Sequence, residues 1–446
     1  MASESSEQGS RKGVRLVFRT LRYRNYRLFF SGQLISLIGT WMQQVALTWL
    51  VYRMTNSALL LGVVGFAGQM PAILMGPFAG VLADRANRHR IIILTQTLSM
   101  VQAAVLAVLT LTGSITVLHI IVLSIFLGMV NAFDMPTRQS FLLDMIESKD
   151  DLPNAIALNS SMFNGARLLG PSIAGLVIAA LGEGLCFLLN ALSYVAVILA
   201  LMAMRITRKQ DLRKKPQRGL QGFSEGFRYA FGFTPIRNIL LLLALASMMG
   251  MPYAVLMPVF ARDILHGGPH TLGFLMGATG VGALAGALTL ASRKSVVGLG
   301  RWIAVASGTF GIGLIMFSFS RTLWLSMTLL FVVGLGMMVQ MASSNTIIQT
   351  IADDDKRGRV MSFYTMSFIG MAPLGSLLAG TLADLIGTPA TLLISGAAVV
   401  LGSIAFASQL PELRKQVHPV YVKLGILPAV SAGLEAASEL TVPPED

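Results

Sequence analysis

Arg167 is the most informative candidate for a functional residue, because its guanidinium lies near the middle of an apolar stretch, 156–181. A charge at that depth costs roughly 2.5–3.5 kcal/mol on membrane-insertion scales, so the side chain should face the interior of a helix bundle and have a partner. Two hypotheses stay open. Arg167 either bonds backbone carbonyls and locks helices together, or it is a cavity charge tied to substrate or to a titrating acid.

Asp134 is the best acidic partner or proton carrier, since no Asp or Glu lies near the centre of any apolar stretch. It lies about seven residues from the centre of its own stretch, roughly 10 Å along a helix, so a direct bond to Arg167 stays open. We group Asp134 and Arg138 with Arg167 as the candidate coupling charges.

The residue pattern gives no support to metal, cofactor or enzyme chemistry. The single cysteine, Cys186, excludes a Cys-based zinc site, and a Gly-Gly-Pro run breaks the helix that would bring His266 and His270 onto one face. No paired acids, histidine cluster or Ser/Lys dyad is evident at membrane depth, and no Gly-x-x-x-x-Gly-Lys-Ser/Thr run occurs. We therefore expect no catalytic residue, no metal, no cofactor and no built-in ATPase.

The elements that must position these charges are membrane helices. The chain has 446 residues, of which 54% are hydrophobic and 12% are charged, about half the charge of an average soluble domain. Roughly twelve spans of about 20 residues fit this length. We predict an all-α membrane protein with twelve transmembrane helices in two six-helix bundles. The expected spans are 28–50, 58–82, 91–112, 117–136, 156–181, 184–204, 237–261, 271–292, 301–319, 323–346, 361–385 and 389–409.

The spans divide the chain into two bundles and three polar segments. Nearly all of the 34 Lys and Arg residues fall on one side, so by the positive-inside rule both termini are cytoplasmic. This asymmetry explains the net charge of +13, and nucleic-acid binding is not needed. A weak internal repeat, in which Gly182 corresponds to Gly387, is typical of transporters. The segments are a cytoplasmic arm (1–27), an N-terminal six-helix bundle (28–204), a basic cytoplasmic linker (205–236), a C-terminal six-helix bundle (237–409) and a cytoplasmic tail that we expect to be disordered (410–446).

The loop from Gly80 to Arg90 has a specific pattern, in which a small residue stands four positions before an acid that three arginines follow. It resembles the signature loop of the major facilitator superfamily, Gly-x-x-x-Asp-Arg-x-Gly-Arg-Arg, with Asn87 in place of glycine and His89 in place of a basic residue. We expect Gly80 to let another helix approach closely and Asp84 to face the positive N-terminus of a neighbouring helix. The candidate gate residues are Gly80, Asp84, Arg85, Arg88 and Arg90.

A second motif surrounds Arg167 and consists of Gly165, Gly170, Pro171 and Gly175. It resembles the Gly-Pro-x-x-Gly antiporter motif of superfamily exporters, while a simple kink stays the alternative. We expect its three glycines to form one ridge on which another helix packs. Residues 19–205 as a whole resemble the drug and siderophore exporter branch, which includes the enterobactin exporter. The segments that carry this resemblance also include 21–27, 48–52, 55–57, 134–139, 151–155 and 189–194.

The resemblance implies a secondary active transporter that exports a small amphipathic molecule, a drug-like compound or a siderophore, by alternating access and in exchange for protons. An uptake or lipid-translocating carrier on the same fold, or a non-transporting polytopic protein, remains the alternative. The expected partners are the substrate, protons and the lipid bilayer, and the expected location is the inner (cytoplasmic) membrane, as a monomer. In the family fold the first and fourth spans of each half line the cavity. The expected substrate contacts there are Trp41, Gln43, Gln44, Asn131, Tyr253 and Gln340.

Overall fold

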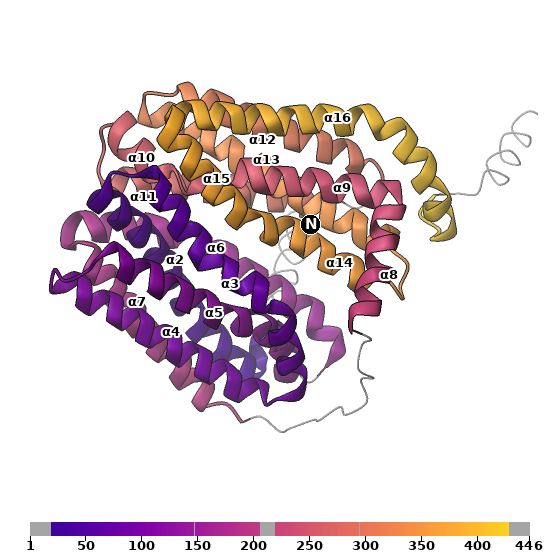
Figure 1. The fold of residues 1–446 in the computed structure, drawn as a ribbon. Helices are drawn as coiled ribbons and strands as arrows, with labels where there is room; N and C mark the ends of the chain where they lie inside the picture. Colours follow the sequence, from indigo (N-terminus) through magenta and orange to yellow (C-terminus); the bar gives the residue numbers. More distant parts are fainter. Residues whose placement is uncertain (1–18, 147, 206–218, 294, 428–446) are drawn as a thin grey trace, which may run out of the picture.

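The computed structural model describes residues 19–146, 148–205, 219–293 and 295–427, and all regular elements in these ranges are helices. Twelve helices in this part of the chain are long and apolar enough to cross a membrane. They form two bundles of six that lie against one another (Figure 1). The predicted fold class is confirmed.

The N-terminal bundle contains six long helices joined by short turns. These are α2 (Arg24–Thr55), α3 (Ala58–Arg85), α4 (Arg88–Leu111), α5 (Val117–Phe141), α6 (Leu152–Leu181) and α7 (Glu183–Met202). Short 3-10 turns adjoin α2, α5 and α6. They are η1 (Arg19–Arg22), η2 (Leu142–Met145) and η3 (Lys149–Asp151).

Two spans of the C-terminal bundle are interrupted by π-helical turns. The first consists of α9 (Thr234–Leu245), the π turn η4 (Ala246–Gly250), η5 (Met251–Ala254), α10 (Met257–Val259) and the π turn η6 (Phe260–Ile264). Pro252 and Pro258 contribute to this irregularity, because proline cannot donate a backbone hydrogen bond. The other interrupted span consists of α14 (Arg357–Thr365), the π turn η7 (Met366–Gly370) and α15 (Met371–Ile386). The uninterrupted spans are α11 (Pro269–Ala291), α12 (Leu299–Phe319), α13 (Leu323–Ile351) and α16 (Thr388–Lys423).

The turn after α6 and the turn after α15 have the same construction. Gly182 has φ 83° and ψ 171°, and Gly387 has φ 85° and ψ 153°. A residue with a Cβ rarely adopts this backbone, so glycine allows each helix to reverse within one residue. The equivalence supports the internal repeat that the sequence indicates.

The two bundles touch at one end, which we term the closed end, and glycines mark this contact. A Cβ on Gly175 of α6 would lie 3.0 Å from the Cα of Gly273 in α11. A Cβ on Gly62 of α3 would likewise lie 3.0 Å from the Cα of Gly380 in α15. Small residues therefore let helix backbones from opposite bundles meet directly.

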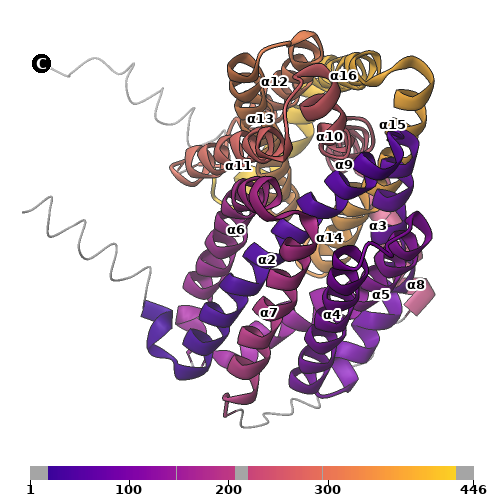
Figure 2. The ribbon, with the colours of Figure 1, turned by 90° about the vertical axis from the view of Figure 1, so that its left-hand side faces the viewer.

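At the other end, which we term the open end, the bundles separate. A Cβ on Gly80, near the C-terminus of α3, would meet no atom of the other described segments within 4 Å. Figure 1 shows the two bundles converging near α10 and α11 and diverging toward α8 (Gly219–Gly232) and α14, and Figure 2 views the molecule from the closed end. No described segment approaches Gly80 closely in this conformation, so its expected close approach stays a prediction.

Part of the expected disordered tail is helical. Helix α16 continues to Lys423, beyond the predicted end at 409, because Leu413 and Tyr421 are buried in an apolar cluster at this end of the bundle. The linker also contains a helix, α8, whose Phe227 and Phe231 contact Phe363 edge-on. The rest of the predicted arm, linker and tail, at 1–18, 206–218 and 428–446, lies outside the described residues.

Asp151 ties the start of the described chain to the N-terminus of α6. Its carboxylate accepts hydrogen bonds from the hydroxyl of Tyr23 and from Arg22, each at 2.7 Å, and lies 3.0 Å from Arg19. The Tyr23 hydrogen bond and the two arginines hold the pKa of Asp151 below its usual range, although burial acts in the opposite direction. The clamp is therefore intact at neutral pH and weakens only as the pH falls through the lowered pKa.

A ladder of neutral amides crosses the interior of the N-terminal bundle and contains Gln43. Asn190 of α7 donates to Gln43 of α2 at 2.8 Å, and Gln43 donates to Gln102 of α4 at 3.0 Å. Gln43 is only 4% exposed, and both atoms of its amide are used within the bundle. Its expected role as a cavity contact does not fit this conformation, because the helix turns the side chain toward α4 and α7.

We expect Gln43→Leu to lower the free energy of unfolding by about 1–3 kcal/mol, because the change leaves the buried Nδ2 of Asn190 and Oε1 of Gln102 without their hydrogen-bond partner. Unfolding in detergent by denaturant or heat measures this. Gln44→Leu is the matched control, since the neighbouring side chain is exposed. Equal stability of the two variants would contradict a structural role for the ladder.

Candidate functional site

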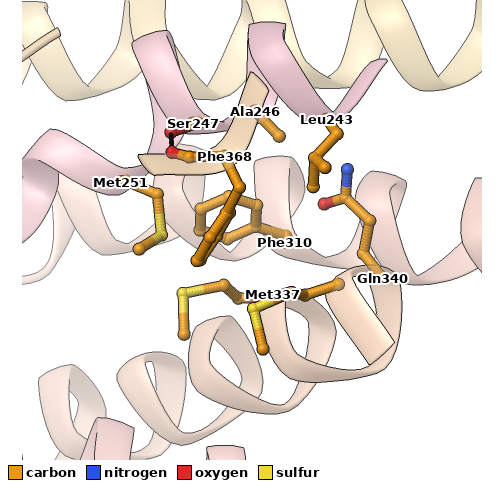
Figure 3. Close-up of a pocket in the computed structure, with 9 residues that line it drawn as sticks. Leu243, Ala246, Ser247, Met251, Phe310, Met337, Gln340 and Phe368 are labelled. Atoms are coloured by element: carbon orange, nitrogen blue, oxygen red, sulfur yellow. Dashed lines mark hydrogen bonds between the residues drawn. The ribbon is translucent and has the colours of Figure 1, made fainter. Parts of the chain in front are cut away.

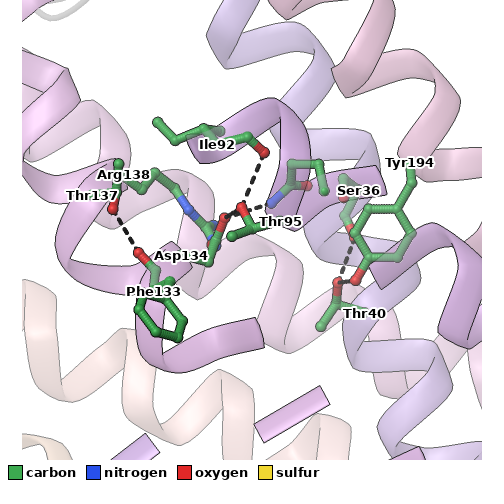
Figure 4. A network of polar contacts seen from close by, with 10 residues as sticks. Ser36, Thr40, Ile92, Thr95, Phe133, Asp134, Thr137, Arg138 and Tyr194 are labelled. Atoms are coloured by element: carbon green, nitrogen blue, oxygen red, sulfur yellow. Dashed lines mark hydrogen bonds and ion pairs between the residues drawn. The ribbon is translucent and has the colours of Figure 1, made fainter. Parts of the chain in front are cut away.

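A buried carboxylate, Asp134, is the centre of the charged site in the N-terminal bundle. It lies on α5 and is 1% exposed. Its Oδ1 accepts hydrogen bonds from Thr95 Oγ1 at 2.7 Å and from Gln96 Nε2 at 2.9 Å, both on α4 (Figure 4). Its Oδ2 pairs with Arg138, one turn further along α5. An ionised carboxylate only accepts hydrogen bonds, and here both of its oxygens have donors.

Sequence reasoning missed the two α4 partners of Asp134. Thr95 and Gln96 are neutral residues in an apolar stretch, and nothing in their spacing points to a distant acid. The pairing of Asp134 with Arg138 could be predicted from the sequence, because residues four apart in a helix are neighbours. The Arg138 side chain is 23% exposed, so the pair connects a buried acid to a more accessible cation.

Arg167 occupies a different place, at the boundary between the bundles. No hydrogen bond or ion pair joins it to Asp134 or to any other described residue, so the structure supports neither partner that the sequence suggested. Its guanidinium carbon lies 5.9 Å from the ring centroid of Trp41, which meets Phe163 edge-on at 5.8 Å. The Arg167 carbonyl lies 3.5 Å from the Cβ position of Gly280 in α11, which belongs to the opposite bundle.

The half-buried Arg167 therefore offers a cation over an aromatic ring, without a protein anion to neutralise it among the described residues. A cation–π contact with Trp is worth about 0.5–2 kcal/mol, which fixes the guanidinium but leaves its hydrogen-bond donors free. Such a group can bind an anionic or carbonyl-bearing ligand.

The three glycines of the antiporter-like motif do not form one ridge. Gly170 faces α2, where a Cβ would lie 2.4 Å from the Cβ of Trp41, and Gly175 faces α11. Gly165 has no other segment within 4 Å of its Cβ position. Five residues correspond to about 500° of helix, so successive members point roughly 140° apart. Pro171 is buried between the two packed glycines.

The structure describes some of the predicted gate residues of the signature loop and leaves others untested. Asn87 caps α4 by accepting a hydrogen bond from the backbone N–H of Arg90 at 3.3 Å, which is a role that the family's glycine cannot fill with a side chain. Arg88 pairs with Asp144 of η2 at 3.2 Å, and Arg90 is exposed. The side chains of Asp84 and Arg85 lie outside the described residues, so their gate role stays a prediction.

The remaining predicted substrate contacts are spread over both bundles. Trp41 and Asn131 are half-buried, and Gln44 is exposed. Tyr253 is 4% exposed and meets Phe310 edge-on at 6.4 Å. Gln340 is 2% exposed and lines a small pocket inside the C-terminal bundle.

The closed end carries a set of polar contacts between the bundles that the sequence did not reveal. Arg262 of η6 donates to Asn56 at 2.7 Å and lies over the Tyr52 ring, 5.9 Å from its centroid. Tyr52 in turn donates to Asp263. Tyr52 and Asn56 belong to the N-terminal bundle, and the two charged residues belong to the C-terminal bundle. We term these four residues the closed-end latch.

Two six-helix bundles that meet at a glycine seam and part at the opposite end, with a buried carboxylate in one bundle and an arginine at the boundary, define a membrane transporter of the major facilitator type. The model of one family, described as transmembrane secretion effector, matches residues 17–422. The chain belongs to this family of major facilitator transporters. It is a transporter and not an enzyme.

Relatives agree with this assignment, and a solved structure shares the fold. The chain is 28% identical to the staphyloferrin A transporter of Staphylococcus aureus over 85% of this chain and 95% of the relative. It is 30% identical to the multidrug efflux pump Tap of Mycolicibacterium fortuitum over 87% of this chain and 96% of the relative. A mutant of the nucleoside transporter NupG has the same fold, with a TM-score of 0.70, 13% identity, and coverage of 86% of this chain and 99% of that chain.

We expect Arg262→Gln to loosen the closed end, because it removes one charge-assisted hydrogen bond and one cation–π contact between the bundles. A loss of about 1 kcal/mol corresponds to about fivefold in a two-state equilibrium. The reporter is Ser376→Cys in a Cys186→Ser background, since Ser376 is 3% exposed and lies against Gly65 across the seam. Its labelling by a maleimide in detergent-solubilised protein should rise about fivefold.

Arg321→Gln is the matched control for Arg262→Gln. Arg321 also lies at the closed end, but among the described residues it donates only to the carbonyls of Ser318 and Ser320 in its own bundle. Unchanged labelling in Arg262→Gln, or an equal rise in both variants, would show that the latch does not hold the bundles together.

Proposed function

We propose that this protein exports a small amphipathic molecule in exchange for protons by alternating access. The observation that carries the proposal is the asymmetric contact between the bundles, which are sealed at the Gly175–Gly273 and Gly62–Gly380 approaches and separated near Gly80. A carrier that alternates needs one sealed end and one open end, and rocking of the two bundles about the boundary exchanges them.

The distribution of basic residues orients this conformation. Helix α8, which carries Arg228, and the Arg88–Arg90 loop lie at the open end, whereas Arg53, Arg262 and Arg321 lie at the closed end. By the positive-inside rule the open end faces the cytoplasm and both termini are cytoplasmic. The conformation is therefore inward-open in the inner membrane, ready to take substrate from the cytoplasm.

Relatives support a drug-like or siderophore substrate. Two of them are named as a staphyloferrin A transporter and a multidrug efflux pump, and a third, 23% identical over 88% of this chain and 98% of its own length, is the macrolide efflux protein A of Streptococcus pyogenes. Two of these names state efflux, which favours export over uptake. Uptake on the same fold stays the second candidate, because the name of the siderophore relative gives no direction.

Asp134 is the proposed proton carrier. Protonation of its carboxylate would cancel the charge that neutralises Arg138 and would turn one acceptor oxygen into a donor facing Thr95 and Gln96. Removing one partner of a fully buried ion pair costs about 3–5 kcal/mol, and the partial exposure of Arg138 lowers this cost, so we expect α4 and α5 to repack at a cost of a few kcal/mol. An energy of this size is enough to move a carrier between two conformations that differ by a few kcal/mol.

We expect Asp134→Asn to abolish the proton dependence of transport, because an amide cannot release a proton. The measurement is the accumulation of a radiolabelled macrolide in everted vesicles, with and without an imposed proton gradient. Downhill exchange of the macrolide should survive in the variant. Asp150→Asn is the control, since Asp150 is an exposed acid of the same bundle. Normal gradient-driven accumulation by Asp134→Asn would refute the coupling role.

We expect Arg167→Ala to abolish transport while folded protein remains in the membrane, because the substrate loses its cationic contact. Arg167→Lys should restore only part of the activity, since an ammonium lacks the planar fork that stacks on Trp41 and bonds two oxygens at once. Initial rates in the same vesicles, normalised to folded protein by size-exclusion chromatography, give the comparison. Full activity of Arg167→Ala would exclude Arg167 as a substrate contact.

A further inference from the structure

Gln33 is a buried amide of the N-terminal bundle that takes part in none of the contacts described above. It lies on α2 and is 2% exposed. Its Oε1 is fully enclosed and has no hydrogen-bond partner among the described residues. Buried polar atoms are normally paired, so an amide oxygen left over in the interior of a membrane bundle needs a physical explanation.

The packing of α2 on α5 puts Gln33 at the depth of Arg138. The rings of Phe29 on α2 and Phe141 on α5 meet edge-on at 6.5 Å. Gln33 stands one helical turn along α2 from this contact, and Arg138 stands one turn back along α5. Because α2 and α5 run in opposite directions, both turns lead away from the open end. Residues one turn apart share a helix face, so the two side chains lie in the layer next to the aromatic contact.

Arg138 has the donor that the oxygen of Gln33 lacks. One terminal nitrogen of its guanidinium pairs with Asp134, as Figure 4 shows, whereas its Nε is buried without a partner among the described residues. An arginine donates through five N–H groups and accepts none, and an amide oxygen only accepts. The unused donor and the unused acceptor are therefore complementary, and the pairing with Asp134 keeps them apart.

Gln96 offers a second unused acceptor, on the other side of Asp134. Its Nε2 donates to the carboxylate, and its Oε1 is buried without a partner among the described residues. Rotation of the amide by half a turn exchanges donor and acceptor, so Gln96 can bond the carboxylate in one state and the protonated carboxyl in the other.

We propose that Gln33 is a positioning residue of the proton switch: when Asp134 takes up a proton, the guanidinium of Arg138 leaves it and donates to Gln33 Oε1. The proton goes onto Oδ1 of Asp134, which then donates it as a hydrogen bond to Gln96 Oε1 once that amide has rotated. Arg138 keeps its charge throughout. The inference rests on the proposed function, because it describes what the proposed proton carrier does to its neighbours.

The change of partner joins two helices that the ionised state leaves unconnected at this depth. The pair of Asp134 and Arg138 lies within α5, whereas a bond from Arg138 to Gln33 ties α5 to α2. Helix α2 also carries Trp41, which contacts Arg167 two turns beyond Gln33. Protonation would thus act on the helix that holds the proposed substrate contact.

No other anion of the described chain competes for Arg138. The other titratable groups around the pair come from α7, α4 and η2 and are Tyr194, His89, Arg88 and Asp144. The carboxylate among them, Asp144, already pairs with Arg88 at 3.2 Å. Gln33 is therefore the acceptor nearest in depth to Arg138 once Asp134 is neutral.

A double-mutant cycle on the purified full-length protein tests the switch without requiring transport. In the wild-type background Gln33→Leu removes an amide without a partner, so the unfolding temperature should stay the same or rise. In the Asp134→Asn background, which imitates the protonated acid, the same change removes the partner of Arg138 and should lower that temperature by about 2 °C. Gln33→Met, of nearly equal length, takes its place if Gln33→Leu does not fold.

Gln340→Leu is the matched control for Gln33→Leu. Gln340 is also 2% exposed, and its Nε2 has no partner among the described residues. It belongs to the C-terminal bundle, where none of the nine residues that line its pocket is charged (Figure 3). With no charge to exchange, Gln340→Leu should shift the unfolding temperature equally in both backgrounds.

Transport in everted vesicles provides the second readout. Gln33→Leu should lower gradient-driven accumulation of the macrolide about tenfold, the effect of one lost hydrogen bond to a charged group, and leave downhill exchange intact. The inference is overturned if Gln33→Leu acts equally in both backgrounds, if Gln340→Leu shows the same difference between them, or if folded Gln33→Leu accumulates macrolide normally.

The two readouts separate the inference from the proposed function. Loss of proton dependence in Asp134→Asn, with an equal effect of Gln33→Leu in both backgrounds, would refute the switch and leave the proposed function standing. Proton-independent export by the wild-type protein, with the expected difference between the backgrounds, would refute the proposed coupling and leave the change of partner at Arg138 standing.

Discussion

The close approach of helix backbones at the closed end is the contact on which the rest of the structure depends. Between membrane helices there is little hydrophobic driving force, so association relies on tight packing and a few hydrogen bonds. Gly175 and Gly273, with Gly62 and Gly380, supply the packing, and the closed-end latch supplies the hydrogen bonds. The packing contact extends along α6 and α11 from Gly175 to Leu168, whereas the hydrogen bonds of the latch are few and lie at the closed end.

The three buried acids of the described chain all lie in the N-terminal half. Asp151 clamps the start of the chain, and Glu183 pairs with Arg53 at 2.7 Å near the closed end. Asp134 is the one within the bundle itself, where an unpaired charge would be most costly. Its three donors come from two helices only, α4 and α5, so a change in its protonation acts directly on how these two helices pack.

The sequence predicted the spans and the fold well, because apolar length and turn residues are local signals. It also placed Arg138 one helical turn from Asp134. It could not provide Thr95, Gln96 or the latch, since these contacts join neutral or distant residues whose meeting depends on tertiary packing. The glycine ridge around Arg167 was wrong because a spacing of five residues does not repeat on one helix face. The π turns at Ala246–Gly250 and Met366–Gly370 left no recognisable pattern in the sequence.

The two bundles differ in chemistry although they share a repeat. The N-terminal bundle holds a buried ion pair and a stacked arginine, whereas the pocket of the C-terminal bundle has sulfur, aromatic rings and an unpaired amide. An amphipathic substrate has the same division, with a polar part that needs a charge or a hydrogen bond and an apolar part that needs adaptable surface. Because the boundary between the bundles is also the place where they move, a ligand that contacts both would couple their motion. The two halves thus share one fold, while their buried side chains differ in chemistry.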